Sequence, residues 1–181
     1  DKLEFIDKAD QSDILAMKAN PKEDVYFVPA FVGLGAPYWD PDCRGALFGL
    51  TRNTGPAEIT KAALESVCYQ TCDLLNAISK DLGDNELSAI RVDGGMSASN
   101  WTMQMLADLL NLPVERPKNL ETTALGAAYF AGMQMGFYPP IEEFAKSWKT
   151  ENQFNSKMTD SNREKKLSGW KDAVSRTLSN K

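Results

Sequence analysis

The residues that could perform chemistry in this chain are restricted in type, because its 181 residues include no histidine. Serine or cysteine nucleophiles that depend on an imidazole base, and metal centres with imidazole ligands, are therefore excluded. Proton transfer would have to use carboxylates, and ligand binding would have to use backbone groups and hydroxyls.

The segment that fits these limits best is Asp93-Gly94-Gly95-Met96, which follows a short apolar run ending at Val92. A glycine pair lets the backbone turn sharply and leaves it open to a ligand. Ligands of open α/β sheets bind at the carboxyl ends of strands, where this loop would lie. A tight turn without a ligand explains one glycine pair equally well. A P-loop enzyme is excluded, because the sequence has no Gly-x4-Gly-Lys-Ser/Thr motif.

Two further segments are candidates. Residues 33–42 combine glycines and prolines with two aromatic and two acidic side chains. Functional and structural loops share this composition, and the pattern alone favours a structural loop. In residues 122–128, Thr122 or Thr123 would cap a helix built from small residues. Tight packing is the simplest interpretation of that helix, and a contact between lobes is the alternative.

The composition restricts the classes of partner that the chain is expected to bind and the cellular compartment in which it is expected. The net charge is −5, so nucleic acid and anionic membranes have no electrostatic basis for binding. No apolar run reaches the ~18–20 residues of a membrane span, and the first residues do not resemble a signal peptide. The three cysteines, Cys43, Cys68 and Cys72, are expected to be free and buried, without a disulfide or a zinc ion. These features are typical of a cytoplasmic globular protein.

The apolar pattern predicts the elements that would position these loops. A weak helix within residues 1–24 ends at Pro21, and β-prone runs over 26–31 and 46–51 flank the loop 33–42. A long helix is expected from Pro56 to a C-cap at Gly83. Its apolar residues recur every three or four positions and are expected to face the core: Leu64, Val67, Cys68, Thr71, Leu74, Leu75 and Ile78.

Strands and helices then alternate. Short strands are predicted over 88–92 and 113–117, and helices over about 97–110 and from about Thr122. A last amphipathic helix over about 163–178 is expected on the outside of the domain. This order is typical of an α/β domain with a central sheet. The whole chain, 1–181, is interpreted as one domain, with a helical lead-in over 1–25 and peripheral C-terminal helices over 140–181.

The same segments, in this order, resemble the glycerol kinases of the FGGY carbohydrate-kinase family. The resemblance extends from about residue 26 to the C-terminus. Four runs carry it: YFVPAFVGLGAPYWDP at 26–41, GALFGL at 45–50, IRVDGG at 90–95 and TALGAA at 123–128.

This resemblance implies an α/β fold of the ribonuclease-H-like, actin/Hsp70/hexokinase type. The chain would be the C-terminal, nucleotide-binding lobe, incomplete at its N-terminal edge, and ATP would bind between two lobes. The implied reaction transfers the γ-phosphate of ATP to glycerol with Mg²⁺, giving ADP and sn-glycerol 3-phosphate. The glycerol site, the catalytic base and most Mg²⁺ ligands would lie in an N-terminal lobe upstream. No catalytic residue is therefore expected here, and Asp40, Asp42 and Asp93 are not candidates for the base.

Matched residue by residue, the resemblance assigns four nucleotide-binding positions. Gly95 and Met96 correspond to the point where the family's nucleotide loop meets ATP, and Gly94 permits the close approach. Ser99 stands where many members have an asparagine near the adenine. The shorter serine keeps a hydrogen bond, which we expect to reach the base through a water molecule.

Two alternatives stay open at this stage. One is a kinase of the same family that acts on another polyol or sugar, although the segment 33–41 favours glycerol. The other is a non-catalytic module that keeps the fold and binds nucleotide or a protein partner. A homo-oligomer is also left open, with exposed apolar surface at the incomplete edge as its physical basis.

Overall fold

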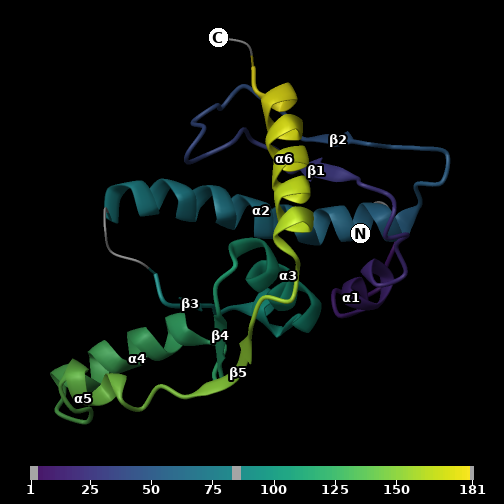
Figure 1. Cartoon of the computed structure of the whole chain (residues 1–181). Coiled ribbons are helices and arrows are strands. Elements are labelled where there is room, and N and C mark those ends of the chain that lie inside the picture. Colours follow the sequence, from purple (N-terminus) through teal and green to yellow (C-terminus); the bar gives the residue numbers. More distant parts are fainter. Residues whose placement is uncertain (1–3, 83–86, 180–181) are drawn as a thin grey trace.

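The first half of the chain is an antiparallel strand pair held against a long helix (Figure 1). The computed structural model describes residues 4–82 and 87–179. Helix α1 (Gln11–Ala16) precedes β1 (Tyr26–Val28), which pairs with β2 (Ala46–Phe48), and α2 (Pro56–Leu82) follows. Strand β2 is shorter than predicted because Gly49 has a φ of +79° and turns the chain beside Asp24. The expected C-cap Gly83 lies outside the described residues.

The second half contains a small mixed sheet. Strand β3 (Ile90–Arg91) is parallel to β4 (Val114–Pro117), and β5 (Thr150–Phe154) is antiparallel to β4, so the order is β3-β4-β5. The 3₁₀ helix η1 (Gly95–Ala98) and α3 (Asn100–Leu110) connect β3 to β4. The remaining helices are α4 (Thr122–Gln134), α5 (Ile141–Ala145) and α6 (Asp160–Thr177).

The C-terminal segment is more central than predicted. Residues 140–181 were expected to form peripheral helices, yet β5 joins the sheet and α6 crosses α2 (Figure 1). Trp170 of α6 is only 1% exposed. Its ring stacks on Tyr69 with the centroids 5.2 Å apart, and its Nε1 donates a hydrogen bond to Asp73 at 2.7 Å. Helix α6 is therefore part of the core, because it packs against β1 and its Trp170 contacts α2.

The buried face of α2 also differs from the prediction. Of the apolar positions expected inside, Val67, Leu74 and Ile78 are 36%, 41% and 45% exposed. The face that packs against α6 instead buries Glu65 and Asp73. These carboxylates have partners, because Lys166 pairs with Glu65 at 2.9 Å and the Tyr38 hydroxyl donates to Asp73 at 2.8 Å. Buried charge is tolerated where it is paired and hydrogen-bonded.

The three cysteine thiols are free and buried, as predicted. Burial raises the pKa of Cys72 to about 12 and that of Cys68 further still. Both thiols therefore stay protonated at neutral pH and behave as small apolar groups. Across the described ranges, no helix combines the length and the apolar character needed to cross a membrane.

Candidate functional site

The candidate loop begins at the carboxyl end of β3, where Gly94 reverses the chain. Gly94 has φ +79° and ψ 174°, a conformation that favours glycine. Its amide donates a hydrogen bond to the Leu120 carbonyl at 3.0 Å. A Cβ added to Gly94 or Gly95 would meet nothing within 4 Å among the described residues. One side of this backbone is thus open to a ligand.

The other side of the loop is fixed by hydrogen bonds within η1. The buried Ser97 donates its hydroxyl to the Gly94 carbonyl at 2.6 Å, and its amide donates to the same oxygen at 3.1 Å. Ser99 is the N-cap of α3, where its Oγ accepts a hydrogen bond from the Thr102 amide at 2.9 Å. A backbone held in this way needs little rearrangement to bind a ligand.

The loop opens onto a cleft of about 340 Å³. Three of the four predicted site residues line it, namely Gly95, Met96 and Ser99. Gly94 is not part of the lining and supports the turn from one residue before it. The opposite wall comes from α1, from the two residues before it and from α2, and its residues are Ala9, Asp10, Ser12, Asp13 and Leu64.

Asp13 is a site residue that the sequence analysis missed. Ser99 donates its hydroxyl proton to Asp13 Oδ1 at 2.6 Å, and the Thr102 hydroxyl lies 2.7 Å from Ser99 Oγ. This bond links α1 to the first turn of α3 across 86 positions of sequence. No local pattern signals such a contact, so it could be found only from the fold.

Arg116 is the second residue that was missed. It lies on β4 with its guanidinium buried beneath η1. Strand alternation was the available signal, because Val114 and Arg116 must point to the same side of the strand. An arginine on the buried side of a short strand indicates a structural or functional task.

Asp93, the residue before the glycine pair, helps to hold the loop in place. The Thr122 hydroxyl donates a hydrogen bond to the Asp93 carboxylate. Thr122 is the first residue of α4 and does not cap it. The N-cap position is Glu121, whose side chain makes no capping hydrogen bond. The pairing joins the start of α4 to the loop.

The second predicted segment, 33–42, has a structural role in the fold. Leu34 and Asp40 exchange backbone hydrogen bonds of 2.8 and 2.9 Å, which close the loop. The Asp40 carboxylate accepts hydrogen bonds from the amide and the hydroxyl of Ser179, each at 2.7 Å, and from the Asp42 amide at 3.0 Å. The Ser179 hydroxyl, with these amides, holds the pKa of Asp40 at about 2. A carboxylate that already accepts these hydrogen bonds and is this weakly basic is poorly suited to accept a proton from a substrate.

The charge of the cleft limits what it can hold. Its described lining residues include two carboxylates, Asp10 and Asp13, and neither lysine nor arginine. A phosphate group there would be repelled, whereas a neutral planar group with N–H donors or hydroxyls would be accepted. Within residues 4–82 and 87–179, no group of three or more acidic or cysteine side chains is placed to hold a metal ion.

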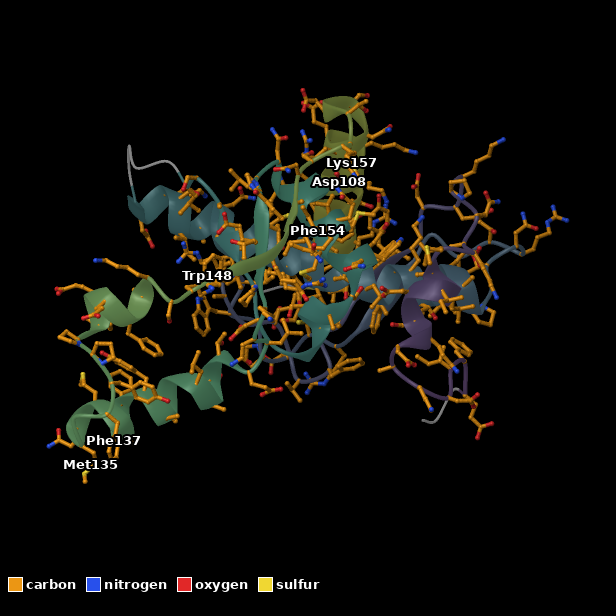
Figure 2. All side chains as sticks on the ribbon, turned by 90° about the horizontal axis from the view of Figure 1, so that it is seen from below. Asp108, Met135, Phe137, Trp148, Phe154 and Lys157 are labelled. Atoms are coloured by element: carbon orange, nitrogen blue, oxygen red, sulfur yellow. The ribbon has the colours of Figure 1, made fainter. Side chains whose placement is uncertain are left out.

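A larger cleft of about 520 Å³ lies between the end of β4, α4 and α5. Lys118, Lys149 and Trp148 line it, and Figure 2 labels Trp148 beside the sheet. The guanidinium of Arg91 lies 4.0 Å from the centre of the Trp148 ring. None of the predicted site residues lines this cleft, so the cleft at Gly95 is the better candidate.

Comparison with known proteins adds a family match. Residues 3–135 match the C-terminal domain of the FGGY family of carbohydrate kinases. The glycerol kinase of Rhizobium rhizogenes is 60% identical over 181 residues, and that of Rhizobium meliloti is 57% identical over 179 residues. The alignments cover 99% and 98% of this chain. The chain spans 36% of the length of each of these relatives.

Solved structures show the same fold. A crystal structure of Plasmodium falciparum glycerol kinase with ADP superposes with a TM-score of 0.86 at 35% identity, over 99% of this chain and 36% of that one. Gluconate kinase from Lactobacillus acidophilus superposes with a TM-score of 0.76 at 21% identity, over 93% of this chain and 34% of that one. The predicted α/β fold of the actin/hexokinase type is thereby confirmed.

Proposed function

The chain belongs to the FGGY family of carbohydrate kinases, and on that premise we propose that it forms the C-terminal, ATP-binding part of a glycerol kinase. The parent enzyme would transfer the γ-phosphate of ATP to glycerol, giving ADP and sn-glycerol 3-phosphate. The observation that carries the proposal is the Gly94-Gly95-Met96 turn, whose open backbone faces the cleft at Ser99. Such a turn between a strand and a helix suits close contact with a nucleotide.

Each site residue has a defined task in this proposal. The backbone of Gly95 and Met96 contacts the nucleoside, and Gly94 supplies the turn that keeps this backbone accessible. The Ser99 hydroxyl is occupied by Asp13 and Thr102 in this structure, so it would hold the base through a bridging water molecule by giving up its contact with the Thr102 hydroxyl. Asp10 and Asp13 make the cleft unsuitable for phosphates, so the nucleoside end of ATP occupies it and the phosphates extend towards the rest of the enzyme.

Mg²⁺ would accompany ATP, where it neutralises charge on the transferring phosphoryl group. Within the described parts of the chain, however, no carboxylate cluster is suited to hold it. We therefore assign its ligands to the ATP phosphates and to other parts of the parent enzyme. The residues of this chain would bind and orient the nucleoside and would not take part in proton transfer.

Glycerol is favoured over other substrates of the family. The relatives at 57–60% identity carry the name glycerol kinase, whereas the gluconate kinase is only 21% identical. The glycerol site and the base would lie in the part of the enzyme that this chain, at 36% of the relatives' length, does not span. Free, buried thiols support a reducing compartment, and we place the enzyme in the cytoplasm.

The test uses the complete enzyme that contains this chain, with ATP and with glycerol, xylulose or gluconate as acceptor. We expect phosphorylation of glycerol. Preference for xylulose or gluconate would replace glycerol by another substrate of the family, and no transfer to any of them would favour a non-catalytic module. The 181-residue chain alone should not phosphorylate glycerol, and turnover by it would contradict the missing-base argument.

A matched pair of substitutions tests the loop itself. A Cβ added at either Gly95 or Gly35 would meet nothing within 4 Å among the described residues, and of the two only Gly95 lines the cleft. Gly95→Leu should raise KM for ATP at least about tenfold, a loss of roughly 1.4 kcal/mol, because the side chain fills the nucleoside site. Gly35→Leu should leave it unchanged. Equal values of KM for the two variants would remove Gly95 from the site.

A further inference from the structure

Arg116 lies on β4 and connects the sheet to the candidate loop through hydrogen bonds of its guanidinium. One terminal nitrogen of its guanidinium donates hydrogen bonds to the carbonyls of Ser97 at 3.0 Å and Ala98 at 3.2 Å, and to Asn100 Oδ1 at 2.9 Å. These acceptors flank Ser99 on both sides. A single buried group therefore fixes the backbone between η1 and the first turn of α3.

The other side of the guanidinium is held by β5. Its Nε donates to Glu151 Oε2 at 3.1 Å, and the Phe154 ring centre lies 5.5 Å from its central carbon. The Arg116 side chain is 8% exposed and that of Glu151 48% exposed. A buried cation is stable only where its donors are satisfied. The loop carbonyls thus stabilise Arg116, and Arg116 in turn fixes their position.

We propose that Arg116 is the positioning residue of the nucleotide loop. It holds Ser97, Ala98 and Asn100 so that Gly95, Met96 and Ser99 face the cleft before ATP arrives. The proposal rests on the proposed nucleotide function of the loop. Without the arginine the loop would have to be ordered on binding, at a cost in conformational entropy that weakens the binding of ATP. Lysine cannot replace it, because an ammonium lacks the planar array of donors.

Arg163 provides a matched control at the opposite end of α3. It is also a buried arginine, 9% exposed, and it donates to the Asp108 carbonyl at 2.6 Å and to Asn111 Oδ1 at 3.1 Å. Its contacts lie at the C-terminal end of α3, in the region where Figure 2 labels Asp108 and Lys157. Arg163→Lys should lower stability as Arg116→Lys does, without contacting the loop.

The kinetic test compares Arg116→Lys and Arg163→Lys in the complete enzyme that contains this chain. In the Arg116 variant we expect KM for ATP to rise about tenfold, with KM for glycerol and kcat at saturating ATP unchanged. The Arg163 variant should keep all three values near those of the wild type. If both variants raise KM for ATP equally, or if KM for glycerol rises in step, Arg116 has only a structural role and the proposal is wrong.

Hydrogen–deuterium exchange of the complete enzyme, measured without ATP, separates this proposal from the kinase assignment. The amides of Ser97 and Ser99, which donate to the carbonyls of Gly94 and Met96, should exchange at least about tenfold faster in Arg116→Lys. They should not change in Arg163→Lys. An enzyme that does not use ATP would remove the kinase function while leaving this readout intact, and unchanged exchange in Arg116→Lys would overturn the positioning role.

A milder variant covers the case in which Arg116→Lys does not fold. Asn100→Ala removes one acceptor of Arg116 at the exposed first position of α3. We expect a rise in KM for ATP of about threefold, since one of the three hydrogen bonds to the loop region is lost. An unchanged KM for ATP in this variant would count against the proposal.

Discussion

Ser99 combines two tasks in one side chain, because it caps α3 and contacts the candidate nucleotide cleft. Ser99→Ala should lower the free energy of unfolding by about 1–2 kcal/mol, since the cap and the bond to Asp13 are both lost. Ser99→Asn should retain most of the stability, because asparagine is as good an N-cap as serine. Urea unfolding of the two variants measures the difference.

Thr159 is a suitable control for the cap, since its hydroxyl accepts from the Asn162 amide at the start of α6, away from the cleft. Thr159→Ala should lower stability by about 1 kcal/mol and leave KM for ATP of the complete enzyme unchanged. Ser99→Ala should change both quantities. A Ser99→Ala enzyme with the KM for ATP of the wild type would remove Ser99 from the nucleotide site.

At the scale of residues, the sequence predicts local backbone features and misses contacts between residues that are far apart along the chain. The turn at Gly94 and the open backbone of Gly95 follow from residue type and from their place between a strand and a helix. The partners of Ser99 and Arg116 do not, because Asp13 lies 86 positions from Ser99 and Arg116 lies 16–19 positions from its acceptors in the loop region. Only the packing of α1 and β4 against α3 brings these groups together.

At the scale of elements, hydrogen bonds from Ser179 to Asp40 link the loop 33–42 to the chain just beyond α6. Its pKa is lowered to about 2 by the Ser179 hydroxyl and by backbone amides. A carboxyl whose pKa is lower in the folded state stabilises the fold above its unfolded pKa of about 3.9. That contribution decreases as the pH falls from about 4 to about 2 and the group becomes protonated in both states.

The prediction is therefore a loss of stability between about pH 4 and pH 2 that is steeper in the wild type than in Asp40→Asn. Urea midpoints measured across this range report it. Ser179→Ala should give an intermediate slope, because the Ser179 amide and the amides of Asp42 and Cys43 still donate to Asp40. Parallel curves for the wild type and Asp40→Asn would show that this link does not contribute to stability.

For whole elements, the apolar periodicity predicted which segments form helices or strands better than it predicted which face of each element is buried. Helix α2 was predicted from its apolar repeat, but its buried face carries Glu65 and Asp73 because Lys166, Tyr38 and Trp170 satisfy them from distant segments. Strand β5 was missed because Thr150-Glu151-Asn152-Gln153 is polar and exposed. Its pairing with β4 rests on backbone hydrogen bonds, which the side-chain pattern does not reveal.

The molecule as a whole exposes apolar surface on α4 and on the face of α2 that carries Val67, Leu74 and Ile78. Helix α4 has an apolar composition on all sides, which is typical of a buried helix, yet only Tyr129 is buried on it. Figure 2 labels Met135 and Phe137 at the far end of the α4–α5 arm, and these side chains are 70% and 79% exposed. Strand β3 is an edge strand of the described sheet, so one side of its backbone is not paired with another described strand. The chain spans 36% of its relatives' length, so we infer that other parts of the parent enzyme cover these surfaces.

This inference predicts opposite effects of one substitution in two proteins. Replacing Val67, Leu74 and Ile78 of α2 by lysine should reduce self-association of the 181-residue chain, because it removes exposed apolar surface. In the complete enzyme the same triple variant should lose stability by roughly 2 kcal/mol or more per site, because each lysine would be placed in an apolar interface. Light scattering of the chain and thermal unfolding of the enzyme measure the two effects. If the triple variant of the enzyme is as stable as the wild type, this face of α2 is exposed there too, and the covering part of the enzyme lies elsewhere.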